Sequence, residues 1–209
     1  MFPTARRIAL ALLLTFATLV SSITAAPAPV YAAIVDSPKY AAIVVDATTG
    51  EVLYARRADS PRYPASITKV MTLYLVFEAL ESGRLSPNDR VVMSPRAAAQ
   101  PPSKLGLAVG DSLSVDDAIR ALAVKSANDV AVALAEKVGG TEARFAAMMT
   151  LKAQELGMNS SRFVNANGLP DSRQLTTARD IAILSRAVMR DYPQYYPYFS
   201  QKYWTLSGQ

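Results

Sequence analysis

The chain has 209 residues, of which 51% are hydrophobic and 19% are charged, and this composition predicts a folded domain. The net charge of +5 comes from scattered residues with no basic block, so we expect no nucleic-acid partner. Cysteine and histidine are both absent, which excludes disulfides, a thiol nucleophile, a histidine-ligated zinc site and a Ser-His-Asp triad; we expect no metal and no cofactor.

The N-terminus predicts an export signal. Arg6 and Arg7 form a positive segment, and residues 8–20 form an apolar run that is followed by small residues. Two cleavage sites fit the pattern, after Ala26 and, better, after Ala32. An apolar run of 13 residues is too short to span a bilayer comfortably. We therefore expect the mature protein to work outside the cytoplasmic membrane, in the periplasm or the cell envelope.

The mature chain begins with a predicted antiparallel hairpin. Its strands are residues 40–46 and 51–56, joined by a turn at 47–50. A polar loop then leads to a helix that starts near Ser66, is apolar nearly all round and is therefore buried, and ends at Gly83. Because a two-stranded hairpin is not stable alone, we expect further strands beside it.

The middle of the chain is predicted to be helical. After an extended piece at 90–93 and a loop at 97–103, capping residues and glycines delimit four helices. These helices run over residues 114–124, 128–138, 141–156 and 177–190. A long loop occupies 163–175, and we expect a last strand at 202–206.

Ser66 and Lys69 carry the first chemical pattern. They are three residues apart, so on a helix they share one face and lie one turn from each other. Lys69 is the only charged residue between Arg62 and Glu78, so burial should lower its pKa and leave a neutral amine that can deprotonate a serine. Alone, Ser-x-x-Lys is equally compatible with a helix N-cap serine and an exposed lysine.

Ser126-x-Asn128 is the second pattern, between two predicted helices. In one interpretation Ser126 caps the following helix. In the other, Ser126 is a second hydroxyl in a proton relay with Lys69, and the Asn128 amide holds a substrate carbonyl. These residues by themselves leave both interpretations open.

Together the two patterns, about sixty residues apart, resemble the penicillin-recognising serine enzymes. The chain more closely resembles the D-alanyl-D-alanine carboxypeptidases, the low-molecular-mass penicillin-binding proteins. Stretches that resemble this family, in family order, are 46–54, 64–72, 126–129, 155–158, 167–169 and 177–180. The resemblance implies an α/β fold, the penicillin-binding-protein/β-lactamase-like serine transpeptidase fold, with an antiparallel sheet flanked by helices plus an all-helical lobe. With the export signal placed at 1–32 from its own pattern, the resemblance implies a catalytic domain at 33–209.

The resemblance further implies a role for each residue of the two patterns. Ser66 would attack the carbonyl between two D-alanines of a peptidoglycan stem peptide, forming an acyl-enzyme, and its backbone N–H would be part of the oxyanion hole. Lys69 would be the general base, Ser126 would help to pass a proton to the leaving amine, and Asn128 would position the substrate. β-Lactam antibiotics would acylate the same serine.

One departure from the family is the absence of its third motif, Lys-Thr-Gly or Lys-Ser-Gly. The only similar string, Leu206-Ser207-Gly208, lacks the lysine. In the family the motif lies on a sheet strand and supplies a cation near the lysine base. We therefore expect the fold to be missing its last sheet strands, and the 209-residue chain to be impaired and poorly stable. Any peripheral membrane association would depend on a C-terminal part that this chain does not contain.

Three alternatives accompany this interpretation. A class A β-lactamase requires a glutamate in the loop before the last helix, but the only acid in 163–175 is Asp171. An endopeptidase that cuts cross-links remains open, because the sequence does not indicate substrate length. The third alternative belongs to a different functional class. It is a non-catalytic peptidoglycan-binding or regulatory protein that merely retains Ser66.

Overall fold

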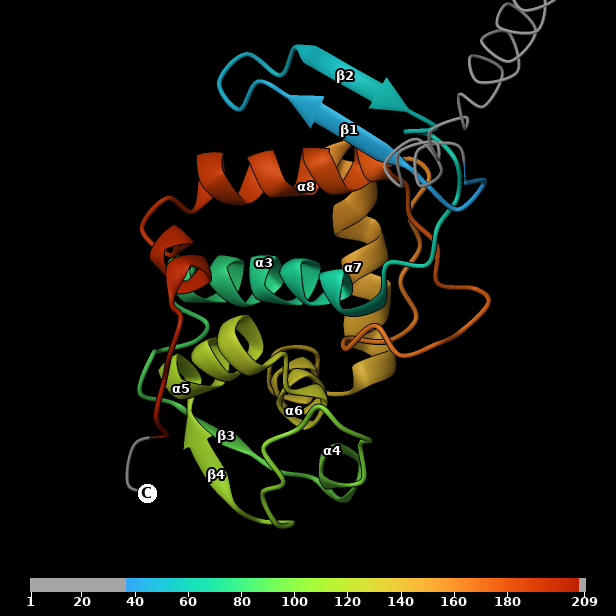
Figure 1. Cartoon of the computed structure of the whole chain (residues 1–209). Helices are drawn as coiled ribbons and strands as arrows, with labels where there is room; N and C mark the ends of the chain where they lie inside the picture. Colours follow the sequence, from blue (N-terminus) through green and yellow to red (C-terminus); the bar gives the residue numbers. More distant parts are fainter. Residues whose placement is uncertain (1–36, 207–209) are drawn as a thin grey trace, which may run out of the picture. The chain divides into compact units, whose positions relative to one another are not determined.

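The computed structural model describes residues 37–206, and Figure 1 shows the architecture of the unit that begins at Ala41. The predicted export signal and its cleavage sites lie outside the described residues. None of the helices in 37–206 has both the length and the apolar character needed to cross a bilayer.

The predicted hairpin is confirmed, with shorter strands. β1 (Ala42–Val45) pairs antiparallel with β2 (Val52–Arg56), and the register shifts at the end of β1. Asp46 closes the turn between the strands. Its side chain accepts hydrogen bonds from the backbone N–H groups of Thr48 and Thr49. The hairpin lies along α8 (Ala178–Asp191), as Figure 1 shows, and Arg186 of α8 donates to the carbonyl of the turn residue Ala47 at 3.0 Å.

The predicted buried helix is also confirmed, and it forms the centre of the core. The helix α3 (Thr68–Glu81) follows a tight 3₁₀ turn, η1 (Ala65–Ile67), so Ser66 lies just before the α-helix. Ten of its side chains from Lys69 to Leu80 are buried, and Gly83 just beyond it adopts a φ of +69°. That left-handed conformation is favourable for glycine and ends the helix.

Helices surround α3 on several sides (Figure 1). They are α5 (Val115–Arg120), which continues into the π-helical turn η2 (Ala121–Lys125), then α6 (Asn128–Gly139), α7 (Glu142–Leu156) and α8. Ser114, Thr141 and Thr177 cap α5, α7 and α8, each by accepting a bond from a backbone N–H three residues on. The capping signals in the sequence therefore located these helices correctly.

Two local predictions are wrong. The expected loop at 97–103 begins inside a short helix, α4 (Pro95–Ala98), because the preceding Ser94 caps it and a proline suits the first helical turn. Residues 202–206 form no strand, since no neighbouring strand pairs with them; instead the Trp204 indole donates to Asp117 at 3.2 Å.

A second small sheet was only half predicted. β3 (Arg90–Val92) was expected as an extended piece, but its partner β4 (Ser112–Ser114) was not. Within residues 37–206 each sheet has two strands, so the further strands expected beside the hairpin are not seen there. The α/β class is confirmed: a helical core around α3, with a hairpin packed on α8.

Candidate active site

Lys69 is the centre of the candidate site. Its side chain is only 3% exposed, and burial lowers its pKa from the ordinary 10.5 to about 8. The predicted burial of this lysine is therefore confirmed. Its Nζ lies 3.4 Å from Ser66 Oγ, 2.8 Å from Asn128 Oδ1 and 2.6 Å from the backbone carbonyl of Asn167.

The three contacts of Lys69 Nζ differ in whether the partner can give up a proton. The amide oxygen of Asn128 and the carbonyl of Asn167 can only accept hydrogen bonds, so each short contact uses one N–H of Lys69. The third direction points to Ser66 Oγ. In the ammonium form that direction holds a proton, and in the neutral form it holds the lone pair. The geometry is that of a base aimed at a hydroxyl.

Ser66 itself is exposed, in the η1 turn at the start of α3. The residue before it, Ala65, has a φ of +48°, a left-handed conformation that costs a non-glycine residue roughly 1–2 kcal/mol. Because η1 directly precedes α3, the Ser66 hydroxyl lies at the N-terminal end of a long buried helix, where the helix dipole favours negative charge.

Asn128 is buried at the first position of α6, and its amide is fixed from both ends. Its Oδ1 accepts from Lys69, and its Nδ2 donates to the carbonyl of Pro101 at 2.9 Å. Nδ2 has a second N–H, so the amide can still donate one bond to a ligand.

Ser126 is placed differently. It ends the η2 turn with a φ of +57° and is half-buried. Its backbone N–H is bonded, but no described residue forms a hydrogen bond with its hydroxyl. The structure thus brings Ser66, Lys69 and Asn128 into direct contact, and it shows no bond between Ser126 Oγ and Lys69.

The loop 163–175 contributes more to the site than the sequence indicated. Besides the Asn167 carbonyl, it contains Gly168, whose φ is +85° and whose Cα faces the backbone of Ala65 and Ser66. A Cβ at that position would lie 1.8 Å from the carbonyl oxygen of Ala65. The Asn-Gly pair is a turn signal, but only the fold reveals what the turn touches.

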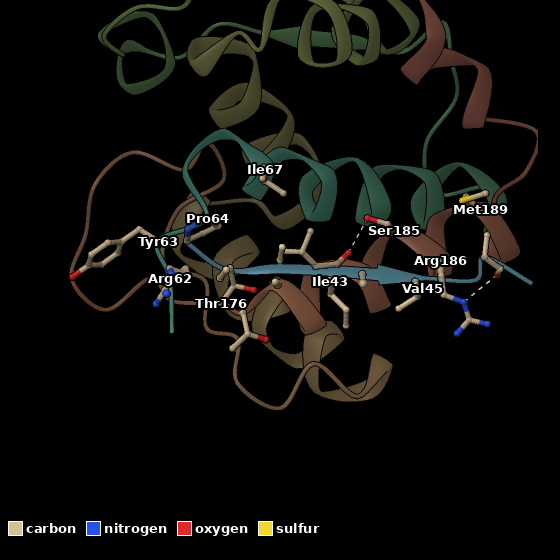
Figure 2. A pocket seen from close by; sticks show the side chains of 17 residues that line it. Ile43, Val45, Arg62, Tyr63, Pro64, Ile67, Thr176, Ser185, Arg186 and Met189 are labelled. Atoms are coloured by element: carbon tan, nitrogen blue, oxygen red, sulfur yellow. Dashed lines mark hydrogen bonds between the residues drawn. The ribbon is translucent and has the colours of Figure 1, made fainter. Parts of the chain in front are cut away.

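Two hollows border the η1 turn that carries Ser66. A groove of about 570 Å³ lies between β1 and α8 and reaches Pro64 and Ile67, beside Ser66 (Figure 2). Figure 2 shows that its walls come from Ile43 and Val45 of the hairpin on one side and from Ser185, Arg186 and Met189 of α8 on the other. A smaller pocket of about 350 Å³ lies between Ala65 and the loop around Leu169. Within 37–206, no group of three or more acidic residues is placed to hold a metal ion.

The sequence and the structure match one family of known proteins. The family model described as D-alanyl-D-alanine carboxypeptidase matches residues 28–209. The chain is 38% identical over 172 residues to the D-alanyl-D-alanine carboxypeptidase DacD of Salmonella typhimurium, covering 79% of this chain and 44% of that protein. It is also similar to the crystal structure of penicillin binding protein 6B from Escherichia coli, with a TM-score of 0.77 and 37% identity, covering 82% of this chain and 56% of that one.

A third match is penicillin-binding protein D2 of Listeria monocytogenes, solved in its ampicillin-bound form, with a TM-score of 0.72 and 30% identity. The matched region covers 80% of this chain and 68% of the Listeria chain. The chain spans less than half the length of the curated relatives that it matches.

Proposed function

The chain belongs to the D-alanyl-D-alanine carboxypeptidase family, and we propose that Ser66 is the nucleophile of a serine carboxypeptidase site. The substrate would be a peptidoglycan stem peptide that ends in D-Ala-D-Ala, from which the terminal D-alanine is removed. The observation that carries this proposal is the buried Lys69, with a pKa of about 8 and its Nζ 3.4 Å from Ser66 Oγ.

The first step follows from this geometry. Neutral Lys69 takes the hydroxyl proton of Ser66, and Oγ attacks the carbonyl carbon between the two D-alanines. The resulting negative charge on the carbonyl oxygen is stabilised by the Ser66 backbone N–H, at the N-terminal end of the buried helix. Two acceptors already bind Lys69, so the new ammonium has partners for its other N–H groups.

The remaining steps use the other side of the site. The C–N bond breaks as the leaving amine receives a proton, which Ser126 relays from Lys69; D-alanine leaves and an ester on Ser66 remains. The free N–H of Asn128 Nδ2 holds the carbonyl of the substrate backbone. Water then attacks the ester and regenerates Ser66. In a β-lactam the strained amide takes the place of the D-Ala-D-Ala bond, and Ser66 is acylated in the same way. The related Listeria protein was solved in an ampicillin-bound form.

The place of action is part of the proposal. The N-terminal 32 residues have the pattern of an export signal. A protein exported in this way meets peptidoglycan at the outer face of the cytoplasmic membrane. Cleavage after Ala32 would leave residues 33–209 as the mature catalytic domain.

The test compares the 209-residue chain with Ser66→Ala. We measure D-alanine release from a diacetyl-Lys-D-Ala-D-Ala peptide and covalent labelling by a fluorescent penicillin. Release and labelling that disappear in Ser66→Ala support the proposal, and strong activity would also contradict the expectation that this chain is impaired. Equal signals from the two proteins would remove the catalytic role from this chain.

One observation favours the non-catalytic peptidoglycan-binding alternative. Lys69 Nζ bonds to Ser66 Oγ, Asn128 Oδ1 and the Asn167 carbonyl, and none of these bonds involves the Ser126 hydroxyl. Under this alternative, Ser66→Ala binds the same peptide with unchanged affinity in calorimetry while neither protein releases D-alanine. An endopeptidase is tested in the same assay by adding a cross-linked dimeric stem peptide.

A further inference from the structure

Gln174 is a buried amide that neither chemical pattern includes. Its side chain lies in the core, 2% exposed, although glutamine is usually a surface residue. All of its hydrogen-bonding capacity is used: Oε1 accepts from the backbone N–H of Val164 and Asn165, and Nε2 donates to Asn165 Oδ1 at 3.1 Å and to Thr68 Oγ1 at 3.3 Å. This amide therefore joins the loop 163–175 to the first residue of α3.

The turn that Gln174 holds is the one that touches the reactive pair. Asn165 Oδ1, which accepts from Gln174, also accepts from the backbone N–H of Gly168 at 2.8 Å. Gly168 in turn lies against the backbone of Ala65 and Ser66, so closely that no side chain fits between them. One residue earlier, the carbonyl of Asn167 accepts the 2.6 Å bond from Lys69.

Other bonds fix the turn from its far side. Thr72 of α3 donates to the carbonyl of Ala166 at 2.7 Å, and the buried carboxylate of Glu142 accepts from the Ala166 N–H. Arg96 pairs with the same carboxylate. The turn is thus held over Lys69 by polar bonds, and Gln174 supplies its only link to the first residue of α3 among the described side chains.

We propose that Gln174 is a positioning residue for the serine acylation site, because its amide holds the Asn165–Gly168 turn over Lys69 and against the Ser66 backbone. This inference rests on the proposed function for its catalytic meaning, but its structural consequence does not. While the turn is in place, it keeps water from Nζ and supplies one of the two acceptors of Lys69. If the turn is released, water reaches Nζ.

The consequence for the proton on Lys69 has a definite sign. Nζ faces three uncharged groups, from Ser66, Asn128 and the Asn167 carbonyl. The charged groups that touch the same turn are Glu142 and its partner Arg96, one hydrogen bond farther away. Since burial is what lowers the pKa of Lys69, hydration of Nζ must raise it towards its ordinary value.

The decisive variant is Gln174→Met, which keeps the length of the side chain and removes all four hydrogen bonds. We titrate the chain labelled with ¹³C and ¹⁵N on lysine by NMR, assigning the Lys69 signal by its absence in Lys69→Met. We expect the pKa of Lys69 to rise by about one unit or more. If the wild type is labelled by a fluorescent penicillin, the pH profile of that labelling should shift upwards by the same amount.

A matched control is Arg173→Ala, the neighbouring residue, whose side chain is exposed and pairs with Asp171 of the same loop. It should leave the pKa of Lys69 unchanged. A folded Gln174→Met with the wild-type pKa would overturn the proposal. If Gln174→Met does not fold, the test uses Gly168→Ala instead. The added Cβ must displace the same turn from Ser66 while Gln174 stays in place. An unchanged pKa of Lys69 in Gly168→Ala would also overturn the proposal.

These outcomes are separate from those of the proposed function. The NMR titration needs no substrate, so a chain without any Ser66-dependent labelling can still show the expected rise. Conversely, a chain that releases D-alanine but keeps its Lys69 pKa in both variants retains the proposed function and loses the positioning role of Gln174.

Discussion

The two sides of the candidate site are built in opposite ways. On one side Lys69 is buried and bonded to Asn128 and to the Asn167 carbonyl, within a loop that is itself bonded to α3. On the other side Ser126 is half-buried, at the end of a short π-helical turn, and its hydroxyl has no partner among the described residues.

The difference follows from what each group has to do in the proposed reaction. A base must have its pKa set before the substrate arrives, which requires burial and fixed acceptors in the folded protein. A relay hydroxyl must reach a leaving group that exists only in the complex, so it needs no hydrogen-bond partner in the protein before the substrate binds. We therefore expect changes on the Lys69 side to alter both stability and chemistry, and changes at Ser126 to alter chemistry alone.

The largest expected effect is that of Lys69→Met on acylation. Removal of a general base should lower the rate of labelling by a fluorescent penicillin roughly 10²- to 10⁴-fold. Lys137→Met, on the exposed surface of α6, is the control and should label at the wild-type rate. A Lys69→Met protein that is labelled as fast as the wild type would assign the base role to another group.

Lys69 should also make stability depend on pH. The folded protein loses this proton near pH 8, whereas the unfolded chain keeps it up to about 10.5. Between these values the unfolded state binds more protons, so the free energy of unfolding rises with pH. Relative to Lys69→Met, the wild type should gain up to about 3 kcal/mol between pH 7 and pH 10.5 in urea titrations. A constant difference between the two proteins across this range would mean that Lys69 has an ordinary pKa.

On the Lys69 side of the site, the sequence predicted only the features that depend on neighbouring residues in the chain. Burial of α3 follows from its apolar residues, and the reactive spacing of Ser66 and Lys69 follows from one helical turn. The bond from Lys69 to Asn167 joins residues 98 positions apart, and the bond from Gln174 to Thr68 spans 106. Neither hydrophobic periodicity nor a helix cap predicts contacts between residues so far apart in the sequence, because tertiary packing creates them.

The fold shows the same limit. Helices with their own caps, such as those begun by Thr141 and Thr177, were located to within a residue or two. β4 was missed, since a three-residue strand is defined by its pairing with β3 and not by its own sequence. The expected strand at 202–206 failed for the converse reason, as extended residues without a partner strand form no sheet.

A smaller effect is expected from Asn128→Leu, a change of similar volume. It removes an acceptor of the buried Lys69 side chain and the donor to the Pro101 carbonyl. The free energy of unfolding should fall by about 1–3 kcal/mol. Asn159→Leu, at an exposed turn position, should change it by less than about 0.5 kcal/mol. Equal stability of the two variants would mean that the Asn128 amide is not fixed in solution.

The smallest expected change in stability is that of Ser126→Ala, and it tests the contrast most directly. Because no residue in 37–206 bonds to the Ser126 hydroxyl, the free energy of unfolding should stay within about 0.5 kcal/mol of the wild type. D-alanine release should fall at least about tenfold, because the relay to the leaving amine is lost. Thr72→Val is the matched hydroxyl on the other side: it loses the bond to the Ala166 carbonyl and should cost about 1–3 kcal/mol. If Ser126→Ala were as destabilising as Thr72→Val, the Ser126 hydroxyl would be a structural group in solution. The two sides of the site would then be built alike.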